Sequence, residues 1–196
     1  MVCDKPSGLL AVPGRGEAGQ DCLSRRVQRC CADALIVHRL DMATSGLMLF
    51  ARGTAAQRQL SIDFAQRRVH KRYVAVVQGH VASDEGVIEM ALRADWPRRP
   101  RQVVDPVHGK PSLTRYRVLD RTADDTTRVE LEPVTGRAHQ LRVHLHALGH
   151  PILGDALYAP AQVLQRSARL LLHASTLCFA HPATREPLHL ACEVPF

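Results

Sequence analysis

Short apolar runs, each broken off by turn-forming residues, constrain the fold of this chain more than any other feature. The chain carries 12 glycines and 12 prolines, and they separate the runs. The runs are shorter than typical helices, and several alternate apolar and polar residues or are rich in β-branched residues, which is typical of strands. We expect strands at residues 35–37, 47–51, 73–79, 112–119, 127–131, 170–179 and 188–194.

Two segments have the apolar spacing of a helix instead. Residues 54–66 place apolar side chains about one turn apart, and Thr54 is positioned to cap the first turn. Residues 140–148 repeat leucine on one face before Gly149, a common helix stop. Many strands with few helices predict an α+β fold with a mixed, largely antiparallel β-sheet and flanking helices, in a single domain spanning 1–196.

The charge of the chain indicates a polyanionic partner. Its formal net charge is +7, with 26 lysines and arginines. Arginine dominates and suits forked contacts to phosphate. The arginines concentrate in residues 25–29, 66–72 and 96–102, which we expect to be surface loops facing a nucleic-acid backbone.

Several classes of protein do not fit the composition. No apolar run approaches the length of about 20 residues that a membrane helix needs, and the start MVCDKPSGLL lacks the pattern of a secretory signal. The six cysteines contain no C-x-x-C spacing, which favours buried small side chains in a reducing compartment. We therefore expect a cytoplasmic protein, and a monomer because no long coiled-coil pattern is present.

The stretch VHRLDMATSG at residues 37–46 places charged side chains between two predicted strands. Asp41 lies close to the core there, and a carboxylate in such a place needs a cationic partner. Arg39 is near in sequence, while Arg137 and Arg142 lie far downstream. A loop acid that bonds to its own turn explains the same residues equally well. The spacing alone leaves these alternatives open.

Five short motifs follow one another along nearly the whole chain: Lys5-Pro6-Ser7-Gly8, HRLD-x-x-T-S-G at 38–46, Lys71-Arg72-Tyr73, GR-x-HQLR-x-H at 136–144 and GHPI-x-GD at 149–155. Their order and length resemble those of the RluA family of RNA pseudouridine synthases. Within that family the chain is most similar to members that act on both large-subunit ribosomal RNA and transfer RNA.

The resemblance implies an isomerase that needs neither cofactor nor metal. Such an enzyme breaks the bond between uracil and ribose, turns the base and joins it again through carbon. Asp41 matches the essential catalytic carboxylate, which attacks the sugar or removes a proton from it. Arg142 matches the arginine that pairs with this carboxylate. Tyr73 matches the tyrosine that stacks on the target base and can take part in proton transfer.

Three more residues are implied in binding the substrate. Arg39 matches the arginine that enters the RNA where the uridine has flipped out of the stack. Arg137 is a further substrate-binding arginine. Leu172 is a candidate wall against the uracil, although an ordinary core position in a strand explains it as well. His38 has no implied role beyond positioning the Asp41 loop.

The start of the chain departs from the family pattern. Family members usually have a strand before the Lys5 motif and sometimes an S4-like RNA-binding module, and we expect both to be missing here. A missing strand would leave the edge of the sheet incomplete.

Two rival functions use the same sequence differently. His139, His144, His146 and His150 crowd one region and could serve a metal-dependent hydrolase, but no H-E-x-x-H pattern accompanies them. A non-catalytic RNA-binding or ribosome-assembly protein would carry the same basic surface. The joint presence of Asp41, Tyr73 and Arg142 favours the enzyme.

Overall fold

The computed structural model describes the backbone of residues 1–196 and every side chain except that of Ala18. The chain forms two compact units. Unit 1 consists of Met1–Lys71 and His173–Pro195, and unit 2 consists of Arg72–Leu172 together with Phe196.

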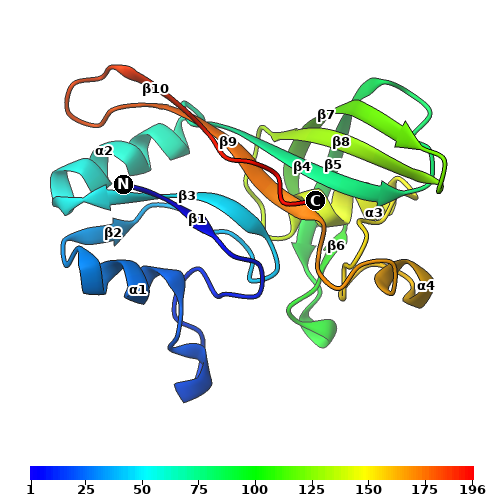
Figure 1. Cartoon of the computed structure of the whole chain (residues 1–196), viewed down its shortest axis with the longest axis horizontal. Helices are drawn as coiled ribbons and strands as arrows, with labels where there is room; N and C mark the ends of the chain where they lie inside the picture. Colours follow the sequence, from blue (N-terminus) through cyan, green and yellow to red (C-terminus); the bar gives the residue numbers. More distant parts are fainter. The chain divides into compact units, whose positions relative to one another are not determined.

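Unit 1 is built around strand β3. Its elements are β1 (Val2–Lys5), the 3-10 helix η1 (Glu17–Gly19), α1 (Leu23–Cys30), β2 (Ala34–Ile36), β3 (Ser45–Arg52), α2 (Gly53–Ala65), β9 (Leu172–Ala180) and β10 (Pro187–Ala191). Strands β1 and β2 pair with β3 antiparallel, β9 pairs with it parallel, and β10 extends β9 antiparallel (Figure 1). One parallel pair among antiparallel ones makes this a mixed sheet, as predicted.

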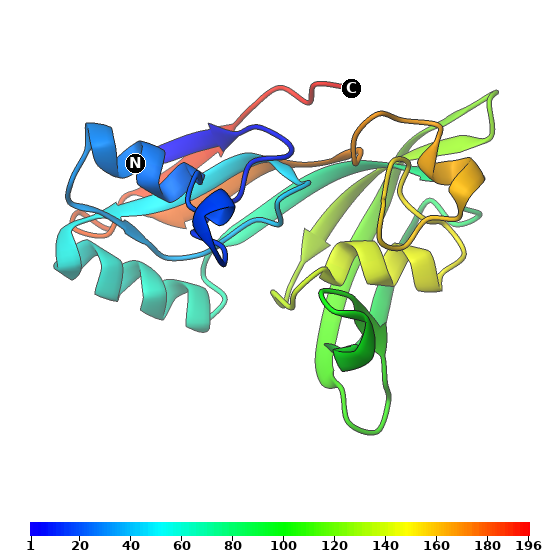
Figure 2. The same cartoon turned by 90° about the horizontal axis from the view of Figure 1, so that it is seen from below.

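The core of unit 1 lies between this sheet and α2. Alternate residues Leu47 and Leu49 of β3 and Leu177 of β9 share one buried cluster with Leu60 of α2. Figure 2 shows α2, in cyan, running along the sheet. The period of two in the strands and of about four in the helix therefore direct their apolar side chains into the same core.

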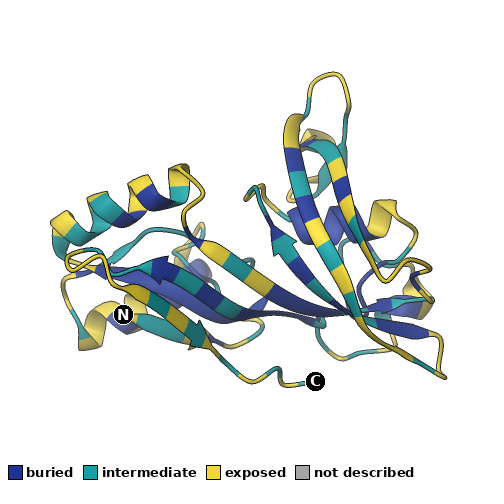
Figure 3. Cartoon of the chain, turned by 90° about the horizontal axis from the view of Figure 1, so that it is seen from above, coloured by how far each residue is buried: buried dark blue, intermediate teal, exposed yellow. Residues whose placement is uncertain are grey.

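Unit 2 contains an antiparallel sheet. Its elements are β4 (His70–Gln78), β5 (Glu85–Ala94), the 3-10 helix η2 (Trp96–Arg98), β6 (Gln102–Val104), β7 (Lys110–Thr122), β8 (Thr126–Pro133), α3 (Gln140–Ala147) and α4 (Ala161–Leu164). The strand order is β4-β8-β7-β5-β6. Burial alternates along β8, which gives the banded strands of Figure 3. Helix α3 packs on this sheet through Val143, which meets Leu92 and Tyr158 in a buried cluster.

Three predictions of local structure are wrong. The strand expected to be missing at the Lys5 motif is present as β1, which pairs with β3 at Cys3↔Met48. Its apolar run is too short to predict a strand from the sequence. Residues 25–29 lie in helix α1, whose buried Leu23 and Val27 leave the arginines on the outer face. Helix α2 begins at Gly53 with Arg52 as N-cap and no side-chain cap, so Thr54 does not cap it.

The remaining predicted elements are confirmed within a few residues at their ends. The predicted basic loops at 66–72 and 96–102 run partly into β4 and β6. Strands β5 and β6 and helices α1 and α4 were not predicted. Among the residues that the structure describes, no helix has the length and apolar character to cross a membrane.

Gly46→Ala is expected to lower the free energy of unfolding by more than about 3 kcal/mol. Gly46 has a φ of +108°, and a Cβ there would lie 2.3 Å from the carbonyl oxygen of Ala174 on β9. Gly53→Ala is the matched control, because Gly53 has a φ of +77° with nothing within 4 Å of the added Cβ. That change is expected to cost about 1 kcal/mol. Urea unfolding measures both, and equal losses would show that the β3–β9 contact tolerates the methyl group.

Candidate active site

The loop between β2 and β3 carries Asp41 and Arg39. Leu40 between them is buried, at 4 % exposure, and anchors the loop in unit 1. Arg39 is exposed and Asp41 is half-buried. The backbone N–H of Thr44 donates to the carbonyl oxygen of Asp41 at 3.1 Å, which closes a turn directly after the acid.

Buried Lys5 fixes this loop from β1. Its side chain is fully buried, and its ammonium donates to the carbonyl oxygens of Pro6, Leu9 and Met42 at 2.9, 2.7 and 3.0 Å. Met42 directly follows Asp41 in the chain. Charge-assisted bonds of this kind are among the stronger ones in proteins, so the cation holds the loop backbone in one position.

The residues after Lys5 add two more contacts to the same loop. The Ser7 hydroxyl donates to the carbonyl oxygen of Ala43 at 2.7 Å, and the Gly8 N–H donates to that of Met42 at 2.9 Å. Two motifs more than thirty positions apart in the sequence therefore form one hydrogen-bonded structure.

His38 supports the loop at its beginning. Its Nε2 accepts the N–H of Leu49 on β3 at 2.8 Å, and its ring stacks on Phe64 of α2 with 4.8 Å between centroids. Burial, with a smaller contribution from the charge of Lys71, lowers the pKa of His38 to about 3. The imidazole is neutral at pH 7 and acts as a hydrogen-bond acceptor, which is consistent with the positioning role expected for His38.

In unit 2 the guanidinium of Arg142 makes a forked ion pair with Asp155. Nε and Nη2 of Arg142 donate to the two carboxylate oxygens at 2.8 and 2.6 Å, and both side chains are almost fully buried. Asp155 also accepts the N–H groups of Leu157 and Tyr158. These bonds fix the orientation of Arg142 on α3. Its predicted pairing with Asp41 stays a prediction.

Asp155 was not predicted as a functional residue. The residue belongs to the GHPI-x-GD motif at 149–155 that supports the family resemblance. A carboxylate at the end of such a motif needs a cationic partner if it is buried in the fold. That signal was available, but the spacing of thirteen positions from Arg142 did not identify the partner.

The other predicted site residues of unit 2 come from separate elements. Tyr73 is buried on β4 and pairs with Leu131 of β8. Arg137 is exposed in the loop before α3, where its Nε donates to the carbonyl oxygen of Pro111 at 3.2 Å. Leu172 is buried at the beginning of β9. The exposed Arg137 side chain is accessible to a ligand. The burial of Leu172 also fits an ordinary position in the hydrophobic core.

Comparison with known proteins identifies the family. A model of the RNA pseudouridylate synthase family matches residues 1–147. This chain belongs to that family. Its curated relatives include the dual-specificity RNA pseudouridine synthases RluA of Yersinia pestis, 50 % identical over 100 % of this chain and 95 % of the relative, and of Escherichia coli K12, 52 % identical over 93 % and 84 %.

Solved structures agree with the pseudouridylate synthase fold. The human RNA pseudouridylate synthase domain containing 1 has a TM-score of 0.83 at 32 % identity, covering 100 % of this chain and 80 % of that one. The human domain containing 4 has a TM-score of 0.76 at 29 % identity, covering 99 % and 85 %. The predicted α+β class and the resemblance to RluA-type enzymes are confirmed. As a pseudouridine synthase the chain is an isomerase, and its partner is RNA.

Three of the four histidines in the rival metal hypothesis make hydrogen bonds within this synthase. The His144 ring is fully buried between Ser112 and Thr114, at 2.8 and 3.0 Å, and burial lowers its pKa to about 4. His139 bonds to the Tyr158 hydroxyl and His150 to a backbone oxygen. Among the residues that the structure describes, the ligand atoms of these histidines do not form a metal-binding group.

The protein is expected to lose stability as the pH falls from about 6.5 toward 4. The unfolded chain takes up protons on His38 and His144 in this range, near the ordinary histidine pKa of about 6.5, while the folded protein holds both rings neutral. The contribution of these neutral rings to the free energy of unfolding is therefore complete above the unfolded pKa, and it declines as the pH falls below that value. At pH 5 each ring contributes a loss of about 2 kcal/mol.

His38→Gln keeps an oxygen acceptor for the Leu49 N–H but cannot bind a proton. Urea unfolding at pH 7.5 and pH 5 is expected to show about 2 kcal/mol less acid destabilisation in this variant than in the wild type. His108→Gln, which replaces a histidine with a 77 % exposed side chain, is the control. An unchanged acid response in His38→Gln would mean that the ring is protonated in the folded protein.

Proposed function

We propose that this chain converts specific uridines to pseudouridine in large-subunit ribosomal RNA, in the anticodon stem-loop of transfer RNA, or in both. The curated relatives named above support this substrate class, because their printed names describe dual-specificity RNA pseudouridine synthases. The identity of about half the residues over nearly the whole chain is the single observation that carries the proposal.

Asp41 is the proposed catalytic carboxylate. In the reaction the bond from N1 of uracil to the ribose breaks, the base turns, and C5 forms the new bond to the same sugar carbon. C5 then loses its proton and N1 gains one, so no oxidant, reductant or cofactor is required. Asp41 would attack the sugar or take a proton from it. The bonds from Lys5 to the adjacent Met42 support this role, since they fix the loop that carries the acid.

Arg142 is the proposed partner of the Asp41 carboxylate, and it would keep that group ionised. A guanidinium has five N–H donors, so a single arginine can bind more than one carboxylate, and the forked contact to Asp155 fixes its orientation. Tyr73 is proposed to place its ring against the uracil, with Leu172 as an apolar wall. In this arrangement Asp155 is a positioning residue that acts through Arg142.

The exposed arginines are proposed to bind the RNA. Arg39 would fill the gap that the flipped uridine leaves in the stack, and Arg137 would contact the substrate near α3. Trp96 offers a further contact, because it is 65 % exposed and the Arg99 guanidinium lies 4.5 Å from its ring centroid. Exposed aromatic rings next to arginine suit unpaired bases. We further propose that the chain acts as a monomer in the cytoplasm, without a metal in catalysis.

Mapping pseudouridine in defined RNAs tests this function. Wild type, Asp41→Asn and Asp41→Ala are incubated with ribosomal RNA and transfer RNA transcripts, and pseudouridine is located by a chemical adduct that stops reverse transcription. The wild type is expected to modify discrete uridines. Both Asp41 variants are expected to lose at least about 1000-fold in rate, while their affinity for RNA stays within about threefold because the arginines are intact.

Asp21→Asn is the matched control, since it removes an exposed carboxylate of unit 1 outside the proposed site. Its rate is expected to equal that of the wild type. Equal product from Asp41→Asn and wild type would contradict the role of Asp41. Tight RNA binding by the wild type without product on any cellular RNA would favour a non-catalytic RNA-binding protein.

A further inference from the structure

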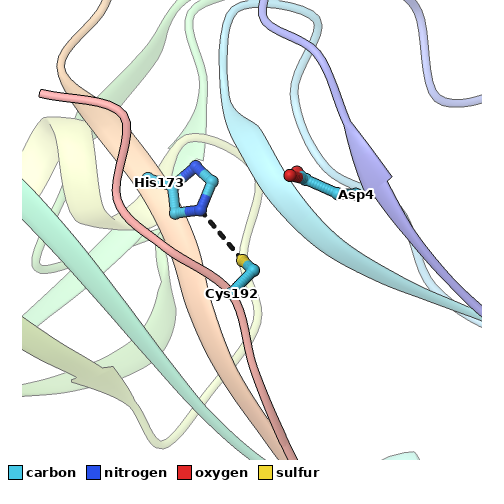
Figure 4. Close-up of side chains that lie close together, drawn as sticks. All are labelled: Asp4, His173 and Cys192. Atoms are coloured by element: carbon cyan, nitrogen blue, oxygen red, sulfur yellow. Dashed lines mark hydrogen bonds between the residues drawn. The ribbon is translucent and has the colours of Figure 1, made fainter.

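Asp4, His173 and Cys192 bring three different metal-ligating groups together in unit 1. Their ligand atoms all lie within 4.8 Å of one another (Figure 4). Asp4 comes from β1, His173 from β9, and Cys192 from the residues after β10. A carboxylate, an imidazole and a thiol form the donor set that zinc-class ions prefer. None of the three belongs to the proposed catalytic or RNA-binding residues.

The imidazole of His173 directs one ring nitrogen to Ser45 and the other to Cys192. His173 is buried at 1 % exposure, and its Nδ1 lies 2.8 Å from the hydroxyl oxygen of Ser45 on β3. If Nδ1 carries the proton and donates it to Ser45, Nε2 presents its lone pair to the cluster. A hydrogen bond on the second ring nitrogen is the usual support of a metal-bound histidine. Nε2 lies 3.0 Å from the Cys192 sulfur.

The electrostatics of the cluster favour a cation. The Asp4 carboxylate lies within 4.8 Å of the Cys192 sulfur and of the nearest His173 ring nitrogen, so a cation among them is attracted by its negative charge. On binding, the Cys192 thiol would release its proton to solvent and ligate the ion as a thiolate. Asp4 is exposed, so an ion could enter from solvent and keep a water molecule as its fourth ligand.

The geometry needs only a small adjustment. Bonds of about 2.0 to 2.3 Å in a tetrahedron separate ligand atoms by about 3.3 to 3.8 Å. The longest separation, at most 4.8 Å, therefore has to close by about 1 to 1.5 Å, which the exposed Asp4 side chain can supply by rotation, while the 3.0 Å between His173 Nε2 and Cys192 Sγ has to widen by about half an ångström.

We propose that Asp4, His173 and Cys192 form a binding site for a zinc-class divalent ion. Cys192 would bind through Sγ, His173 through Nε2 and Asp4 through a carboxylate oxygen. The ion would tie β1, β9 and the segment after β10 together and so stabilise unit 1. It takes no part in the isomerisation.

Cobalt(II) is the probe, because a tetrahedral cobalt–thiolate centre absorbs in the near ultraviolet and the visible. The full chain, free of affinity tags, is titrated with Co²⁺ under anaerobic reducing conditions. The wild type is expected to bind one equivalent with a sulfur-to-cobalt charge-transfer band, which added Zn²⁺ removes. Zn²⁺ is also expected to raise the melting temperature by a few degrees.

Three variants decide the outcome. Cys192→Ala is expected to lose the charge-transfer band, and Asp4→Asn is expected to weaken Co²⁺ binding by about tenfold or more while keeping the thiolate band at high metal. Cys30→Ala removes an exposed thiol on α1 and is expected to behave as wild type. No band in the wild type, or the same band in Cys192→Ala, would overturn the proposal. Asp4→Asn changes an exposed side chain and keeps the test valid if Cys192→Ala does not fold.

Discussion

The candidate site of unit 1 depends on the hydrogen bonds that the buried ammonium group of Lys5 donates to three backbone carbonyl oxygens. Transferring a charged amine out of water costs several kcal/mol unless polar groups surround it. The carbonyl oxygens of Pro6, Leu9 and Met42 do so. Because one of these oxygens belongs to the residue after Asp41, the same hydrogen bonds solvate the buried cation and fix the position of the Asp41 loop. Neutral His38 then fixes the other end of the loop to β3.

Unit 2 applies the same principle to a different charge. Arg142 is buried on α3 and depends on Asp155 for compensation. The pair stabilises the protein less than its distances suggest, because desolvation offsets much of the attraction. Its value is orientation, since a guanidinium held at two nitrogens by a carboxylate has little freedom to turn. In unit 1 the buried Lys5 ammonium fixes the loop of Asp41, and in unit 2 the buried Asp155 carboxylate fixes Arg142. Each of these charged groups thus orients a side chain that is proposed to act in the reaction.

The sequence predicted those parts of the protein that local patterns determine. Residues 47–51 form a short continuous apolar run and residues 54–66 have a helical period, and both became elements of unit 1 with small changes at their ends. Helix α1 was missed because its buried stripe is only Leu23, Ser24 and Val27 among arginines. Strand β1 was missed because edge pairing with β3, rather than its own apolar content, forms it.

Long-range partners of charged residues were the main part that the sequence could not supply. Nothing local links Lys5 to Met42 or Arg142 to Asp155, because the separation along the chain carries no information on contact. The family resemblance named Asp41, Arg142 and Tyr73 for the site, but it left out the groups that hold them. His38 shows the same limit, since its role follows from Leu49 and Phe64, which only the folded chain brings to it.

A crystal structure of the Asp41→Asn variant bound to a substrate stem-loop RNA would test the central claim most directly. The amide has the shape of the carboxylate but cannot start the reaction, so the uridine stays in place. We predict that the target uridine lies outside the RNA stack, with its ribose carbon against the side chain at position 41 and its uracil against Tyr73. A uridine that remains stacked in the RNA, or that binds away from residue 41, would contradict the account.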